Sequence, residues 1–197
     1  MCRALTTIGV DPVVTTSPAT VAMACAVVLP GVGAAGASMT RMKELGLTAA
    51  LRTAIAEGTP FLGVCLGMQL LFGHQDEGNV EGLGVLPGRV RRLSPGVKIP
   101  QIGWNRVRLV EAGPLGHAGD DHDAYFVHSF IAEGVDPADI AGLTRYGEVF
   151  PSIVMRESVW GVQFHPEKSG DWGLELLRTW GALIHARHAA PVAAASA

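Results

Sequence analysis

In the first half of the chain, short apolar runs alternate with segments of helical period. The runs at residues 25–34 and 60–64 predict buried strands, and apolar positions three and four apart over residues 38–57 predict one or two helices interrupted near Gly46. Ser17 followed by Pro18 predicts a helix start, whereas residues 1–9 look like a helix end closed by Gly9. Residues 11–18 are predicted to be rich in β structure. The alternation predicts an α/β fold with a mostly parallel central sheet flanked by helices.

The second half shows a different pattern. Short runs with a period of two, such as residues 99–110 and 123–130, predict additional antiparallel strands, and RESV at residues 156–159 suggests a hairpin turn. In the last segment, Trp172, Leu176, Trp180 and Leu183 share one face of a predicted helix, which indicates core packing. We expect a single domain over residues 1–188 and a disordered tail over residues 189–197.

The apolar run at residues 60–64 leads directly into a cysteine with a glycine two residues away on either side, and a helical pattern follows. This strand, sharp turn and helix has the form of a nucleophile elbow, in which glycines allow close backbone contact and the nucleophile stands at a helix start. Cys65 is therefore the candidate nucleophile, because the helix N-terminus stabilises negative charge on a thiolate. The alternative is a buried structural cysteine followed by a core helix.

A cysteine nucleophile needs a base, and the base needs an acceptor that fixes its tautomer. His165 and Glu167 follow an apolar run, two residues apart on the same side of an extended segment, with Pro166 stiffening the chain between them. Both the elbow and this segment belong at one edge of the sheet. We therefore predict a Cys65–His165–Glu167 triad over the alternative of a structural histidine.

Composition narrows the possible partners and the compartment. The net charge is −3 and only 17% of the residues are charged, so charge gives no argument for binding nucleic acid or a membrane. Cys2, Cys25 and Cys65 lack the spacing of a disulfide framework or a zinc site, which favours a reducing cytoplasm. His117 and the acidic run at residues 120–123 are interpreted as a solvated loop. We expect no metal and no cofactor.

The residues that suggest a triad also carry a resemblance to a known family. PFLGVCLGMQLL (60–71) together with QFHPE (163–167) resembles class I, triad-type glutamine amidotransferases. Further matches are LPGVGA (29–34), DEG (76–78), GLGV (82–85), KIP (98–100), IGWN (102–105), YFVHSF (125–130) and HPEKSG (165–170). Their order resembles the glutaminase subunits of imidazole glycerol phosphate synthase, a subfamily of histidine biosynthesis, over roughly residues 13–177.

The resemblance implies a role for each matching residue. Cys65 would attack the side-chain amide of glutamine, His165 would protonate the departing ammonia, and Glu167 would orient the imidazole. The oxyanion hole would use the N–H of Leu66 and that of Val32 or Gly33. Matching substrate-binding positions are Gln69, Glu77, His128 and Ser129, although each of the first three also has an ordinary structural explanation.

The resemblance also implies a heterodimer in which ammonia passes to a TIM-barrel cyclase subunit. Five residues match positions at or near that interface: Lys98, Trp104, Asn105, Tyr125 and Lys168. An exposed Trp or Tyr is better explained by docking than by a free surface. Arg89, Arg91 and Arg92 are interpreted as decorating an exposed strand or reaching a partner's surface, without forming a site.

The sequence departs from the family pattern in a few places. Family members usually have a strand, a loop and most of a helix before the point where this sequence starts, so we expect a truncated domain whose first strand is missing. Gln101 stands where the family commonly has His, and Ala35 where an aromatic residue is common. Two alternatives stay open: another class I glutaminase, such as the one that feeds pyridoxal phosphate synthase, or a catalytically silent subunit that only binds its partner.

Overall fold

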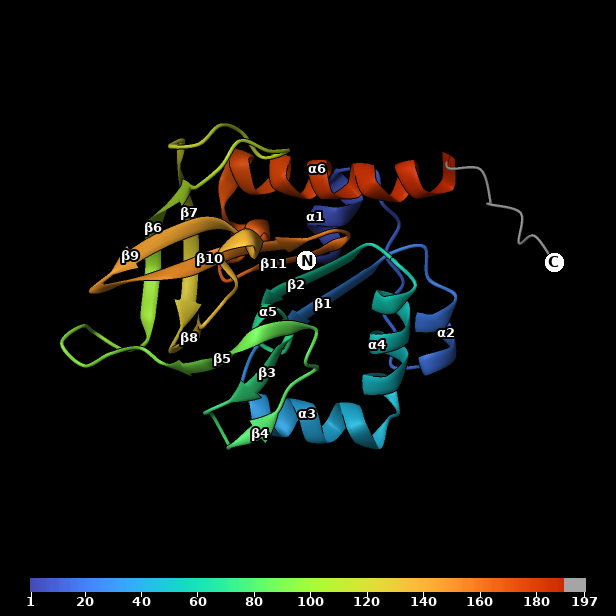
Figure 1. Cartoon of the computed structure of the whole chain (residues 1–197). Helices are drawn as coiled ribbons and strands as arrows, with labels where there is room; N and C mark the ends of the chain where they lie inside the picture. Colours follow the sequence, from blue (N-terminus) through green and yellow to red (C-terminus); the bar gives the residue numbers. More distant parts are fainter. Residues whose placement is uncertain (190–197) are drawn as a thin grey trace.

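A seven-stranded sheet forms the centre of the computed structural model, which describes residues 1–189 (Figure 1). The strand order across the sheet is β1-β2-β11-β10-β9-β6-β7. The strands are β1 (Val27–Gly31), β2 (Phe61–Cys65), β6 (Gln101–Leu109), β7 (Asp121–His128), β9 (Ile140–Tyr146), β10 (Glu148–Arg156) and β11 (Val159–Val162).

A smaller sheet lies beside the first, with the strand order β4-β3-β5-β8. Its strands are β3 (Phe72–Gln75), β4 (Val80–Glu81), β5 (Leu86–Arg92) and β8 (Phe130–Glu133). The helices are α1 (Cys2–Thr7), α2 (Pro18–Ala22), α3 (Ala35–Glu44), α4 (Leu47–Ala56), α5 (Leu66–Gln69) and α6 (Gly170–Ala189), with short 3₁₀ turns η1 (Pro137–Asp139) and η2 (Pro166–Lys168).

The sheet is mixed. Strands β1, β2 and β11 run parallel, whereas β11, β10, β9, β6 and β7 pair antiparallel in that order. The predicted α/β class, with antiparallel strands in the second half, is confirmed. The parallel part of this sheet consists of β1, β2 and β11. Strand β2 ends at the elbow and β11 leads into QFHPE, so the carboxyl ends of β2 and β11 meet at one edge.

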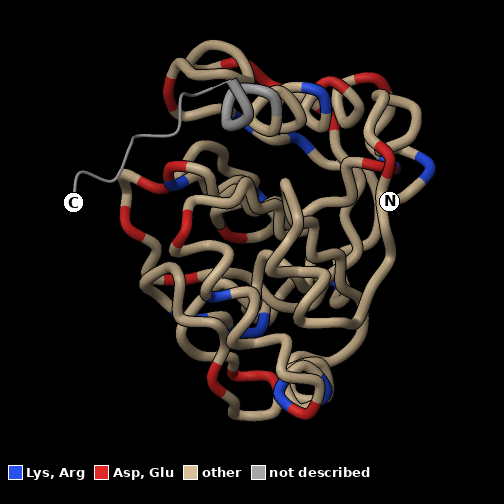
Figure 2. The backbone as a smooth tube through the Cα atoms, turned by 90° about the vertical axis from the view of Figure 1, so that its right-hand side faces the viewer, with Lys and Arg blue, Asp and Glu red and all other residues tan. Residues whose placement is uncertain are grey.

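Helices cover the parallel strands on both faces (Figure 1). One core cluster joins Leu5 of α1 and Trp180 of α6 to Leu62 and Val162 of the sheet. The other joins α2, α3 and α4 to Phe61 of β2 and to the smaller sheet. The predicted core face of the last helix is confirmed, since Leu176 and Trp180 are each 1% exposed and Trp172 and Leu183 pack against the same cluster. Many of the charged positions lie on the outer loops and helices (Figure 2).

Local signals fix several helix ends as expected. The Ser17 side chain accepts a hydrogen bond from Thr20 N–H at the start of α2. Gly46 has φ 71°, a left-handed conformation that glycine adopts without strain, and it separates α3 from α4. The first residues form α1 as predicted.

Two sequence predictions are wrong in detail. Residues 10–17 form no strand, because Val13 and Val14 are 77% and 83% exposed and have no strand beside them to pair with. Within the described residues, β1 is an end strand that pairs with β2 alone. The elbow helix is only four residues long, since Phe72 already begins β3. The predicted tail lies outside the described residues, apart from Ala189 at the end of α6.

Candidate active site

The turn after β2 is held by main-chain contacts that leave no room for side chains. A Cβ on Gly63 would lie 2.7 Å from the carbonyl oxygen of Gly67, and a Cβ on Gly67 would overlap the carbonyl oxygen of Leu29 on β1. Cys65 itself has φ 54°, a left-handed conformation that is strained for a residue with a side chain. The two glycines are therefore needed for the close approach that the sequence predicts.

Cys65 is buried, with 6% of its surface exposed. Its Sγ lies 3.5 Å from the carbonyl oxygen of Val127 on β7, and the side-chain N–H of Gln163 donates to Sγ at 3.7 Å. Because α5 has only four residues, the helix dipole behind the sulfur is weak, and side chains and main-chain groups of other elements dominate its surroundings.

His165 begins the η2 turn at the end of the segment that follows β11. Its Nδ1 lies 3.0 Å from Oε1 of Glu167, so Nε2 is the ring nitrogen that can exchange a proton with Cys65. The main chain of His165 is also fixed: its N–H donates to the carbonyl oxygen of Tyr125 at 2.9 Å, and its carbonyl accepts from Ser169 Oγ at 2.7 Å. Glu167 thus holds the His165 ring, and the Cys65 side chain is close enough to His165 to influence the pKa of that ring.

His165 and Glu167 stabilise each other's charged forms. The hydrogen bonds of His165 to Cys65 and to Glu167 raise its pKa to about 9, although burial acts in the opposite direction. Burial raises the pKa of Glu167, but the hydrogen bond from His165 and a backbone hydrogen bond outweigh it, so the net shift of that pKa is downward. At neutral pH the pair is therefore an imidazolium held by a carboxylate.

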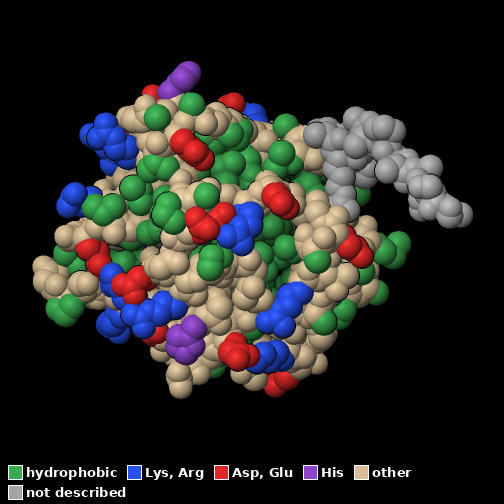
Figure 3. Space-filling model, viewed as in Figure 1, with side chains coloured by type: hydrophobic (Ala, Val, Ile, Leu, Met, Phe, Trp, Pro, Cys, Tyr) green, Lys and Arg blue, Asp and Glu red, His purple; other side chains and the backbone are tan. Residues whose placement is uncertain are grey.

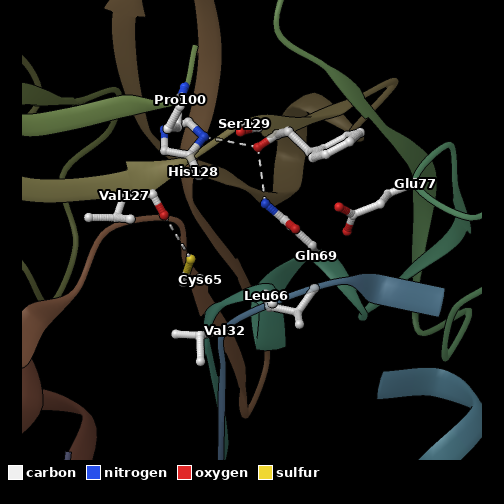
Figure 4. Close-up of a pocket in the computed structure, with 11 residues that line it drawn as sticks. Val32, Cys65, Leu66, Gln69, Glu77, Pro100, Val127, His128 and Ser129 are labelled. Carbon is white, nitrogen blue, oxygen red and sulfur yellow. Dashed lines mark hydrogen bonds between the residues drawn. The ribbon is translucent and has the colours of Figure 1, made fainter. Parts of the chain in front are cut away.

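A cavity of about 200 Å³ opens beside Cys65 (Figure 4). Its walls contain every residue predicted for the oxyanion hole and for substrate binding: Val32, Gly33, Leu66, Gln69, Glu77, His128 and Ser129. Pro100, Val127 and Phe130 also line it and were not predicted. They lie in segments that carry the family resemblance, but nothing in their residue type marks them as lining a cavity.

Gln69 lies on α5, one helical turn after Cys65, and points into the cavity (Figure 4). Its side-chain nitrogen donates to the carbonyl oxygen of Phe130 at 3.0 Å and to Oε1 of Gln163 at 2.9 Å. Both amide N–H groups are therefore in use, which leaves the carbonyl oxygen of Gln69 as the acceptor that a ligand can reach.

Glu77 lies at the opposite side of the cavity from Val127 (Figure 4). Its Oε2 accepts a hydrogen bond of 2.7 Å from the backbone N–H of Ala35 at the start of α3. This bond fixes the loop that carries Glu77 beside the loop that carries Val32 and Gly33.

His128 is part of a buried wall. Burial lowers its pKa to about 4, so the ring is neutral near pH 7. Its Nδ1 donates to the carbonyl oxygen of Phe130 at 2.9 Å, and its Nε2 lies 3.1 Å from Oε1 of Gln101. Gln101, which stands where the family commonly has His, is 3% exposed and supports the cavity wall.

Comparisons with known proteins agree with this geometry. The family model described as "Glutamine amidotransferase class-I" matches residues 2–180. The chain belongs to the class I glutamine amidotransferase family.

Two curated relatives carry the same name, "Imidazole glycerol phosphate synthase subunit HisH". The protein from Herpetosiphon aurantiacus is 46% identical over 186 residues, which cover 94% of this chain and 89% of that protein. The protein from Symbiobacterium thermophilum is 47% identical over 185 residues, covering 92% and 87%. The predicted resemblance is confirmed.

Solved structures support the fold. A structure described as "Crystal structure of glutamine amidotransferase" has a TM-score of 0.74 at 20% identity and covers 93% of this chain and 91% of its own. A putative GMP synthase component from Thermoplasma acidophilum has a TM-score of 0.68 at 19% identity, covering 95% and 87%. At these identities the likeness concerns the class I amidotransferase fold alone.

The outer face of β6 and β7 carries exposed apolar side chains next to the cavity. Trp104 pairs with Tyr125 and Ile102 with Val127 across the two strands, and both Trp104 and Ile102 are 60% exposed. Lys168 Nζ lies 5.7 Å from the centre of the Tyr125 ring. We call Ile102, Trp104, Tyr125 and Val127 the outer apolar face. It contains two of the five residues predicted for the partner interface.

The other three predicted interface residues differ in position. Lys168 borders the outer apolar face from η2, whereas Lys98 is exposed on the loop before β6, where its carbonyl accepts from Tyr146 OH at 2.8 Å. Asn105 lies on the opposite face of β6 from Trp104, because side chains alternate along a strand, and its amide donates to the carbonyl oxygen of Arg145 at 3.0 Å.

Other charged residues take structural positions. Arg91 pairs with Glu133 and Glu148, and Arg89 pairs with Glu133, so these two arginines join β5 to β8 and β10. His117 contacts Asp120 in an exposed turn. On the face shown in Figure 3, acidic and basic side chains are intermixed without a patch of one sign. None of the helices in residues 1–189 is both long and apolar enough to cross a membrane.

Proposed function

We propose that this chain is the glutaminase subunit of an imidazole glycerol phosphate synthase and hydrolyses glutamine to glutamate and ammonia. The observation that carries the proposal is Cys65 at the wall of a cavity, near a His165 ring that is hydrogen-bonded to Glu167, in a member of the class I amidotransferase family. The name carried by relatives at 46% and 47% identity adds the synthase, and with it a place in histidine biosynthesis.

In the proposed reaction, the Cys65 thiolate attacks the side-chain amide carbon of glutamine. The negative charge that develops on the amide oxygen needs donors already in place. The N–H of Leu66, at the start of α5, supplies one, since the first N–H groups of a helix have no partner within it. The loop with Val32 and Gly33 supplies the second. Gly33 has φ 92°, which only glycine adopts readily, so this loop can reorient its peptide planes.

His165 then gives its Nε2 proton to the amide nitrogen, and ammonia leaves as the C–N bond breaks. A glutamyl thioester on Cys65 remains. Water attacks the thioester carbon and returns a proton to His165, while the C–S bond breaks and glutamate leaves. Glu167 holds Nδ1 throughout, so the proton is always exchanged at Nε2.

The cavity provides acceptor groups for the amino acid end of glutamine. The oxygen of Gln69 and the carboxylate of Glu77 suit the α-ammonium group, and the main chain at His128 and Ser129 completes the wall. His128 is neutral and already bonded at both ring nitrogens, so its contribution comes from its main chain.

Ammonia is useful only if it escapes protonation in bulk water, which favours a docked consumer. We propose that the outer apolar face, with Lys168 beside it and Lys98 on the loop before β6, binds a TIM-barrel cyclase subunit to form a heterodimer. Asn105 supports this face from behind through Arg145. A cytoplasmic location, a single domain and independence from metals and cofactors are part of the same proposal.

Glutamate release tests the proposal. We expect slow release by the chain alone, stimulation by the cyclase subunit with its ligand bound, and loss of at least about 10³-fold in Cys65→Ala. An unchanged rate in Cys65→Ala would show that another residue does the chemistry. Cyclase activity that is supported by ammonia and never by glutamine would favour a silent partner-binding subunit. If glutamate release is stimulated by the synthase component of pyridoxal phosphate formation and not by the cyclase, the chain is the class I glutaminase that feeds pyridoxal phosphate synthase.

A further inference from the structure

The strongest feature that the proposed chemistry leaves unused is a buried glutamine beside the nucleophile. Gln163 follows β11, two residues before His165, and is 0% exposed. A buried amide is costly unless its polar groups are bonded, so its partners define what it does. Both its nitrogen and its oxygen face residues of the candidate site.

The hydrogen bonds around Gln163 form a chain with one direction. Gln69 donates one N–H to the carbonyl of Phe130 and the other to Oε1 of Gln163. Since Oε1 of Gln163 is the acceptor, its NH₂ group must face the other way, toward Cys65 Sγ at 3.7 Å. The orientation of each amide is therefore fixed by its neighbour.

The polar groups around the sulfur act in opposite directions. The carbonyl of Val127, 3.5 Å from Sγ, can only accept a hydrogen bond and so favours the neutral thiol. His165 and Gln163 donate, and therefore favour the thiolate. Of these two donors, His165 must give its proton away during the reaction, whereas Gln163 keeps its own.

We propose that Gln163 stabilises the Cys65 thiolate by a permanent N–H···S hydrogen bond and, through the same side chain, aims the oxygen of Gln69 into the cavity. The role of this hydrogen bond in catalysis rests on the proposed function, whereas the test of the hydrogen bond itself does not depend on that function. Gln163 is a second donor that remains in place while the imidazolium is deprotonated.

Alkylation of Cys65 by iodoacetamide, measured against pH, reads the thiolate directly. Peptide mass spectrometry separates Cys65 from the exposed Cys2 and Cys25. In Gln163→Met, which keeps the volume and removes the donor, we expect the midpoint of the profile to move upward by about one pH unit, which means roughly tenfold less thiolate below the midpoint.

Gln75→Met is the matched control. Gln75 is also 0% exposed and also bonds Gln69, donating to its main-chain carbonyl oxygen at 2.7 Å, but its hydrogen bond does not involve the sulfur. We expect its alkylation profile to equal that of the parent. If Gln163→Met does not fold, Gln163→Asn replaces it as the test variant. Its shorter side chain retains an amide but withdraws it from Sγ, so the midpoint should shift in the same direction.

An unchanged midpoint in Gln163→Met, or an equal shift in Gln75→Met, would overturn the proposal and leave Gln163 a packing residue. This failure is distinct from failure of the proposed function, because alkylation needs no glutamine. A parent that never releases glutamate would refute the proposed function whatever the alkylation profiles show.

Discussion

The elbow and the outer apolar face differ most clearly in how tightly their residues are packed and how much of their surface is exposed. At the elbow, Gly63 and Gly67 let main chain press on main chain, and Cys65 is 6% exposed. On the outer apolar face, Ile102 and Trp104 are each 60% exposed. The difference means that Cys65 is positioned by contacts inside the chain, whereas the face beside it leaves apolar side chains exposed, as the proposed docking of a partner requires.

Strand β7 joins the two regions. Val127 directs its side chain outward, with 37% exposed, while its carbonyl lies 3.5 Å from Cys65 Sγ. Two residues earlier, the carbonyl of Tyr125 accepts from His165 N–H, and the N–H of Tyr125 donates to Ser169 Oγ at 3.0 Å. Any partner bound to the outer apolar face therefore touches the strand whose main chain contacts both reacting residues.

The largest expected effect comes from filling the tightest contact at the elbow. In Gly67→Ala, the new Cβ would overlap the Leu29 carbonyl oxygen, and backbone cannot move away as a flexible side chain can. We expect a loss of about 4 kcal/mol or more in the free energy of unfolding, measured by urea denaturation.

Gly113→Ala is the control for this change, because a Cβ there would meet nothing within 4 Å. It should change the free energy of unfolding by less than about 0.5 kcal/mol. Equal stability of the Gly67→Ala and Gly113→Ala proteins would mean that the elbow is not closed by main-chain contact.

A smaller effect is expected at the outer apolar face. Trp104→Ala removes the largest exposed side chain of that face, and we expect about 2 kcal/mol weaker binding of the cyclase subunit, roughly 30-fold in Kd by calorimetry. Val149→Ala provides the control, because Val149 is 46% exposed but lies on β10, outside the outer apolar face. Equal affinity of the two variants would place the partner elsewhere.

The smallest effect concerns pH. The pKa of His165 is raised to about 9, so its protonated form, which gives ammonia its proton, is lost as pH rises through that value. Removing the negative charge of its partner in Glu167→Gln should lower this pKa, and the alkaline fall of kcat/KM should begin about one pH unit lower. An alkaline limb that stays at the same pH would show that Glu167 does not hold the imidazolium.

The same shift affects stability with a defined sign. The pKa of His165 in the folded chain exceeds the value of about 6.5 expected when unfolded. The protonated ring therefore contributes stability that is complete below about pH 6.5 and is lost as pH rises through about 9.

The elbow could be predicted because its requirements are local. Cys65, whose φ is positive, stands between two glycines, and His165 and Glu167 lie two residues apart. Both arrangements are visible in the sequence as residue types at fixed spacing. The length of the helix behind the elbow was not predictable, because the helical pattern at residues 68–72 is divided between α5, a turn and the first residue of β3. There, pairing of β3 with β5 ends the helix.

Contacts between distant segments were also not predictable. Alternation along β6 does separate Trp104 from Asn105, but the identity of the exposed face depends on which side α6 and the core occupy. Gln163 was hidden for a related reason. A polar residue in the apolar run VWGVQF was a signal of a buried polar contact, yet its partners, Gln69 and Cys65, lie 94 and 98 residues away.

The most direct test of the central claim is a search for the glutamyl thioester on Cys65. The complex with the cyclase subunit is mixed with glutamine, quenched in acid within the first turnover, and digested for peptide mass spectrometry. The proposed chemistry predicts a glutamyl adduct on the peptide that contains Cys65, and its absence, together with loss of glutamate release, in Cys65→Ala. Glutamate release at the parent rate by Cys65→Ala, or an adduct on another residue, would contradict it.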